Sequence, residues 1–166
     1  MGRGNKLGIG AQMAAGVVQF LNGTGIDHRG RSLEDILAWP DDQLEMHHDY
    51  IQWLFPLSQP SAAVLGSPVL SAADIEAICA DPAAQTNLLR ALDRMRLFYS
   101  GTTHWLTPGN HNHLRITRII SSLHRLGQPA AARDFYEFVR ARIDAEPGSA
   151  TPLTLSFWEK AVQGRH

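Results

Sequence analysis

The chain contains a single cysteine, Cys79, among its 166 residues. One cysteine cannot form an intrachain disulfide, which is typical of proteins in a reducing compartment. Cys79 lies in the apolar stretch at residues 72–81 and is expected to be a small residue of the hydrophobic core.

Long hydrophobic runs are also missing. No apolar segment approaches the roughly 20 residues that a membrane-spanning helix requires. The start of the chain places Arg3 and Lys6 ahead of an apolar segment, but Gln12 and Gln19 interrupt it and no signal-peptidase site follows. We expect residues 1–18 to be a loose, glycine-rich lead-in to a first helix, and the protein to be cytoplasmic.

The chain has almost no net charge, with a formal value of −1. A nucleic-acid partner is therefore not expected, and any electrostatic recognition must come from a local patch. The common catalytic signatures are also missing: there is no nucleophile elbow, no zinc-protease motif and no phosphate-binding loop. No cofactor is expected, and a binding role is favoured over catalysis.

Helix start and stop signals recur along most of the chain, and no segment shows the two-residue alternation of a strand. Ser32 with Asp35 and Ser71 with Asp74 have capping-box spacing, and Asp81-Pro82 and Thr151-Pro152 are typical helix starts. The proline- and serine-bearing residues 57–70 indicate an extended connector. The sequence predicts a compact all-α bundle of about six to eight helices, with helical segments at 33–39, 40–55, 72–81, 82–100, 111–126, 129–146 and 152–163.

The predicted helix at residues 40–55 is amphipathic. At 100° per residue its apolar side holds Leu44, His47, Tyr50, Ile51, Leu54 and Phe55. The opposite side is acidic and able to form hydrogen bonds, with Asp41, Asp42, Glu45, His48, Asp49 and Gln52. Trp53 lies between the two faces, where an indole can be buried and still reach a partner through its N–H.

The predicted helix at residues 111–126 carries a basic stripe opposite its apolar one. The apolar stripe is Ile116, Ile119, Ile120 and Leu123, and the polar stripe is His111, Arg115, Arg118, Ser122 and Arg125. Asn110 or Asn112 is expected to cap the helix. Its first turn, with free backbone N–H groups and two arginines, suits a carboxylate or a phosphate. The alternative is that Arg115 and Arg118 pair with Asp41, Glu45 or Asp49 and fix how two helices pack.

The histidines also raise the question of a metal. His111 and His113 are two residues apart and His104 is near in sequence, but no cysteine or carboxylate stands beside them as a third ligand. No metal site is predicted.

Two segments, HDYIQWLFPL at 48–57 and HNHLRITRIISSLHRLG at 111–127, resemble signature segments of the opioid growth factor receptor conserved-domain family. WPDDQLE at 39–45 and RALDRMRLFYS at 90–100 are similar to that family as well. The resemblance covers residues 19–163, which we expect to form the conserved domain, and this chain looks like the short, bacterial type that carries the domain alone. It implies an all-helical domain. Animal members are named for binding the pentapeptide Met-enkephalin and are described as nucleus- or membrane-associated.

The polar residues that match the family motifs coincide with those found by helical geometry. The leading hypothesis is a module that binds a peptide or small anionic ligand between the segments at 40–55 and 111–126, through His48, Gln52, Trp53, His111, Asn112, Arg115 and Arg118. One alternative is an enzyme acting on a small anionic substrate with His48 or His111 as the acid–base group. Another is a scaffolding domain whose charges are paired internally. The oligomeric state is left open.

Overall fold

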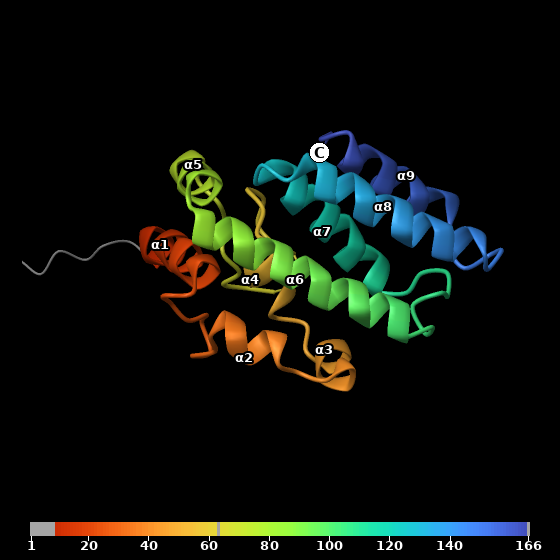
Figure 1. Ribbon diagram of the computed structural model, residues 1–166, viewed down its shortest axis with the longest axis horizontal. Coiled ribbons are helices and arrows are strands. Elements are labelled where there is room, and N and C mark those ends of the chain that lie inside the picture. The colour runs from red at the N-terminus through yellow and green to blue at the C-terminus, as the bar shows by residue number, and fades with distance from the viewer. Residues whose placement is uncertain (1–8, 63, 166) are drawn as a thin grey trace, which may run out of the picture.

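A computed structural model of the chain describes residues 9–62 and 64–165, with side chains from residue 16 onward. These residues form nine helices and one isolated backbone bridge, between Leu57 and Val69 (Figure 1). The all-α prediction is confirmed. The helices are α1 (Ile9–Asn22), α2 (Leu33–Leu37), α3 (Asp41–Met46), α4 (Ile51–Leu54), α5 (Ala72–Ala80), α6 (Pro82–Gly101), α7 (Asn112–Arg125), α8 (Pro129–Asp144) and α9 (Pro152–Val162).

Most helix starts follow from local sequence signals. Ser32 and Ser71 each form a complete capping box with the aspartate three residues later. Asp81 accepts hydrogen bonds from the N–H groups of Ala83 and Ala84 in α6, and Thr151 accepts one from the N–H of Thr154 in α9. At Gly127, which follows α7, φ is +86°, a conformation that glycine adopts without strain.

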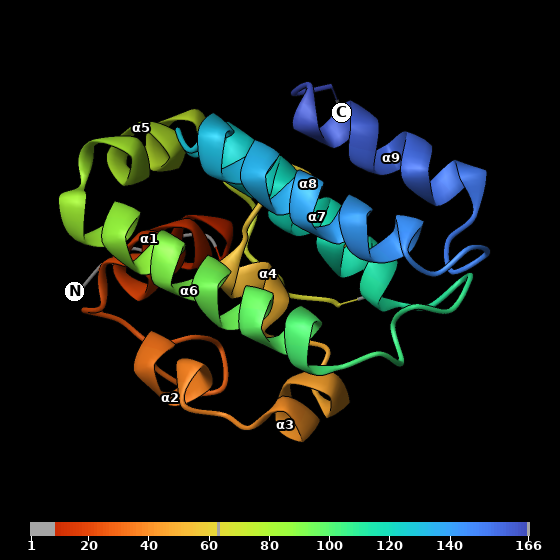
Figure 2. The same ribbon diagram turned by 45° about the vertical axis from the view of Figure 1, so that its right-hand side comes forward.

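The helices form two groups around α6. On one side α1 packs against α5 and α6, and on the other α7 packs against α8 and α9 (Figure 2). The shorter helices α2 and α3 are joined to α6 by the ion pairs Arg90–Glu34 and Arg94–Asp41. The predicted apolar stripe of α7 is fully buried, as expected for a helix that packs against two others.

Two expectations were wrong. Cys79 is exposed, because α5 buries Asp74 and Ile78 rather than the cysteine. The predicted helix at 40–55 is interrupted: α3 ends at Met46, His47 is extended (ψ 138°), and α4 begins only at Ile51. Of the predicted lead-in, residues 1–8 lie outside the described residues, and Ile9 already belongs to α1.

Candidate functional site

The first turn of α7 was expected to offer free N–H groups to an anion, and this is wrong. Oδ1 of Asn110 accepts a hydrogen bond from the N–H of Asn112 at 2.9 Å. The N–H groups of His113 and Leu114 bond the carbonyls of Asn110 and His111. Since the turn satisfies its own donors, recognition of an anion here depends on side chains.

Arg115 has a structural role. Its side chain is 5% exposed, and its guanidinium donates to the carbonyl of Leu44 at 2.9 Å and to that of His47 at 2.6 Å. In a continuous helix these carbonyls would accept from the N–H groups four residues later. Arg115 therefore caps the end of α3 and stabilises the break that separates it from α4.

Glu45 joins α3 to the segment that precedes α7. Its two carboxylate oxygens lie 2.9 Å from Nε2 of His104 and of His111, and Asn112 donates to it at 3.0 Å. Burial disfavours the charged carboxylate, but the hydrogen bonds from Asn112 and His104 and the nearby histidine charges outweigh it, so the pKa of Glu45 is lowered. Burial is also the main reason that the pKa of His111 is lowered, and the Glu45 carboxylate opposes that shift.

This cluster gives a pH-dependent prediction. A carboxyl whose folded pKa is depressed stabilises the fold above its ordinary value of 4.5, and that contribution is lost as the pH falls through the lowered folded value. Glu45→Gln should reduce the free energy of unfolding by about 1–2 kcal/mol near pH 6. The difference from the unmodified chain should shrink as the pH is lowered below 4.5.

The measurement is urea denaturation at several pH values, with Glu76→Gln, an exposed glutamate of α5, as the control for loss of one charge. A difference between Glu45→Gln and the unmodified chain that stays constant across the acidic range would contradict the assignment.

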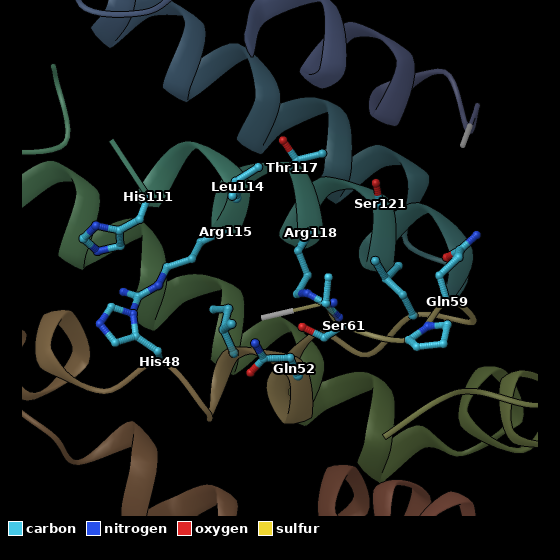
Figure 3. Close-up of a pocket in the computed structure, with 14 residues that line it drawn as sticks. His48, Gln52, Gln59, Ser61, His111, Leu114, Arg115, Thr117, Arg118 and Ser121 are labelled. Carbon is cyan, nitrogen blue, oxygen red and sulfur yellow. The ribbon is translucent and has the colours of Figure 1, made fainter. Parts of the chain in front are cut away.

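A pocket of about 440 Å³ lies beside this cluster (Figure 3). One wall comes from α7 and the segment before it, and the other from α4 and the connector that follows. In Figure 3, Arg118 extends from α7 toward Ser61 and Gln52, and His48 and His111 lie at one end. The lining residues are His48, Ile51, Gln52, Leu57, Gln59, Pro60, Ser61, Ala62, His111, Leu114, Arg115, Thr117, Arg118 and Ser121.

Arg118 is the arginine of this pocket that has no acidic partner among the described residues. Its side chain is partly buried and donates one hydrogen bond, from Nη1 to the carbonyl of Phe55 at 3.3 Å. It forms no ion pair with any carboxylate of residues 16–62 or 64–165. Burial lowers the pKa of Arg118, but an arginine remains charged at neutral pH. Two carboxylates that were expected to pair with Arg118 form ion pairs elsewhere: Asp41 pairs with Arg94, and Asp49 pairs with Arg29 and Arg31.

The same wall holds a buried amide. Gln52 is 4% exposed, and its Oε1 has no hydrogen-bond partner within the described part of the chain. A buried acceptor without a donor costs free energy. Gln52 thus adds a polar side chain to the wall beside Arg118.

The structure brings together five of the seven predicted site residues, His48, Gln52, His111, Arg115 and Arg118. The other two do not line the pocket. Trp53 is 3% exposed and packs against Phe20 and His28. Asn112 is fully buried, bonding Glu45 and accepting from Tyr99. At Trp53 and Asn112 the predicted polar side of each helix is therefore covered by other parts of the protein.

The connector was not expected to form a wall of the pocket. Leu57, Gln59, Pro60, Ser61 and Ala62 all line it, although their composition indicated only an extended loop. The connector is held in place because the carbonyl of Leu57 accepts from Leu70 at 2.9 Å. No pattern in the sequence signals this contact, which joins two ends of the same loop.

Glu45 lies between His104 and His111, but within the described residues no three histidine, cysteine or acidic side chains are placed so that they could hold one metal ion. Nε2 of His113 lies 2.7 Å from the carbonyl of Trp105, and so carries the proton of the neutral ring. Burial lowers the pKa of His113 and favours this neutral form.

Comparison with known proteins places the chain in a family. The sequence profile described as "Opioid growth factor receptor (OGFr) conserved region" matches residues 17–104, more than half of the chain. The chain belongs to this family. The matched region contains α4 and the connector wall of the pocket, whereas α7 lies beyond it.

Mammalian members of the opioid growth factor receptor family resemble the chain over most of its length. The opioid growth factor receptors of Rattus norvegicus and Homo sapiens are each 35% identical over 162 residues, covering 82% of this chain and 27% and 24% of their own. Opioid growth factor receptor-like protein 1 of Rattus norvegicus is 30% identical over 130 residues, covering 66% of this chain and 28% of its own. The chain thus spans about a quarter of these relatives. No solved structure matches it.

None of the described helices is both long enough and apolar enough to cross a membrane.

Proposed function

We propose that the chain is a receptor-like binding module that holds the anionic group of a peptide or small molecule in the pocket between α4 and α7. Family membership supports a binding role, because the mammalian relatives are named as receptors for a growth factor. The observation that carries the proposal is Arg118, a partly buried guanidinium without a carboxylate partner in the described residues.

An unpaired cation such as Arg118 costs free energy in a partly buried position. A charge removed from water loses hydration, and the single long hydrogen bond to Phe55 compensates little of it. A carboxylate or phosphate in the pocket would form charge-assisted hydrogen bonds with Arg118. The apolar wall formed by Ile51, Leu57 and Leu114 would strengthen them by excluding water.

The remaining polar groups then have distinct roles. Gln52 forms part of the wall beside Arg118, and His48 and His111 border the anionic group. Arg115 holds His48 through Nδ1 at 3.3 Å and acts by positioning that wall. A peptide C-terminal carboxylate is one guest that offers both an anion and an adjacent N–H donor.

Benzoate and benzamide are suitable probes because they differ in charge and share an aromatic ring. We expect benzoate to bind and Arg118→Met to weaken its affinity by at least about tenfold, the effect of one charge-assisted hydrogen bond. Arg125→Met removes a partly buried arginine of the same helix that does not line the pocket, and should leave the affinity unchanged. Titration calorimetry or NMR chemical shifts would measure both.

Equal binding of benzoate and benzamide would contradict the proposal. So would equal losses of affinity in Arg118→Met and Arg125→Met, since only general charge would then matter.

A further inference from the structure

Two histidines lie together at one end of the pocket between α4 and α7. The rings of His48 and His111 meet edge to face with their centroids 5.2 Å apart, and both line the pocket beside Arg115 (Figure 3). Both residues are exposed, so protons from solvent reach them. A histidine that lines an anion pocket adds a positive charge to it when it takes up a proton.

The hydrogen bonds of His111 decide which ring nitrogen can take up that proton. Nε2 lies 2.9 Å from Oε1 of Glu45, and because a carboxylate only accepts, Nε2 carries the proton of the neutral ring. The amide of Asn112 also approaches Nε2, at 3.4 Å, but its two N–H groups donate to Glu45 and Asn110 at 3.0 Å. Nδ1 has no hydrogen-bond partner among the described residues, so a second proton can bind there.

His48 is less suited to take up a proton. Nη2 of Arg115 lies 3.3 Å from Nδ1 of His48, and since a guanidinium only donates, Nδ1 accepts and Nε2 carries the ring proton. A second proton on Nδ1 would face the N–H of Arg115 and break this hydrogen bond. Of the two rings, His111 is therefore the one whose charge can change without loss of a hydrogen bond.

The groups around His111 act on its charge in opposite directions. Burial is the main reason that the pKa of His111 lies below its ordinary value of 6.5, and Arg115 of α7, His48 and His104 lower it further. Glu45 of α3 opposes them. The ring is therefore mostly neutral at neutral pH in the free protein. An anion in the pocket would add a second negative charge near the ring and raise this pKa.

We propose that the pocket takes up its anion together with a proton on Nδ1 of His111, so that acidification strengthens binding. This inference rests on the anion-binding role proposed above. The proton comes from solvent, and no covalent bond forms, because the charged ring acts on the anion through space. The coupling is reciprocal: the proton strengthens anion binding by the same factor by which the anion strengthens proton binding.

Benzoate is a suitable probe, because a carboxylate of this kind titrates near about pH 4, below the range in which His111 changes charge. We expect its affinity to rise about two- to fivefold from about pH 8 to about pH 5.5, the range for a partly exposed pair of charges. Since the pKa of His111 in the free protein lies below 6.5, the rise should continue below that pH. Calorimetry in two buffers of different ionisation enthalpy should detect proton uptake with benzoate and none with benzamide.

Two variants assign the proton to one ring. His111→Gln keeps an N–H that can donate to Glu45 but cannot become charged, so its benzoate affinity should not change with pH. His104→Gln is the matched control, because His104 lies 2.9 Å from the same carboxylate but does not line the pocket. It should keep both the pH dependence and the proton uptake. In the unmodified chain, the pKa of His111 measured by ¹⁵N NMR should rise when benzoate is added.

Benzoate binding that does not change with pH, or that occurs without proton uptake, would overturn this proposal and leave the anion site in place. Equal loss of the pH dependence in His111→Gln and His104→Gln would also overturn it. Absence of benzoate binding at every pH would instead remove the anion site itself, and this proposal with it.

Discussion

Arg115→Met is expected to lower the free energy of unfolding by about 3–4 kcal/mol. The guanidinium is almost fully buried and bonds the carbonyls of Leu44 and His47, which lie at the end of α3. Methionine fills much of the same space but donates nothing. The carbonyl of His47 would then lose its partner, and Glu45 would lose a neighbouring cation.

Arg118→Met is the control for this effect, because Arg118 lies three residues later on the same face of α7. It donates one long hydrogen bond and is partly exposed, so its removal should change the free energy of unfolding by less than about 1 kcal/mol. Urea denaturation followed by circular dichroism measures both variants. Similar losses in the two would show that the roles assigned to these arginines are wrong.

Trp105→Ala is expected to cost about 3–5 kcal/mol, the usual range for removing a fully buried tryptophan. The indole has no exposed surface, packs edge-on against Tyr99 at 5.2 Å, and donates from Nε1 to the carbonyls of Tyr99 and Thr102 at 3.1 Å. It holds the segment between α6 and α7, and its own carbonyl fixes His113.

Trp105→Phe separates the contribution of packing from that of the N–H hydrogen bonds. The phenyl ring keeps most of the packing but lacks the N–H, so we expect a loss of about 1–2 kcal/mol. Thermal and urea denaturation of both variants would test the assignment. If phenylalanine were as damaging as alanine, the hydrogen bonds and not the packing would hold the segment. If alanine cost less than about 1 kcal/mol, neither would.

Much of the fold follows from signals that act within a few residues. The capping boxes at Ser32 and Ser71 and the helix start at Asp81-Pro82 are where the sequence predicts them, because each is completed by groups one to three residues away. The buried stripe Ile116, Ile119, Ile120 and Leu123 follows from helical periodicity alone.

The interruption between α3 and α4 could not be predicted in the same way. Residues 40–55 have good helical periodicity, and the group that ends α3 is Arg115, about 70 residues later in the chain. Periodicity reports which face a helix would bury. It does not report whether a distant side chain will compete for the carbonyls that the helix needs.

Local sequence signals are enough to specify the helical class, most helix starts and the basic stripe on α7. The function of that stripe depends on which distant segments pack against it. Arg115 and Arg118 have the same chemistry, and both line the pocket. The end of α3 buries Arg115 and accepts its hydrogen bonds, whereas Arg118 is only partly buried and donates one long hydrogen bond. The connector at 57–62 forms the opposite wall, and Cys79 remains exposed, for the same reason. Burial and pairing depend on which distant segment packs over a residue, and spacing along one helix carries no information about that.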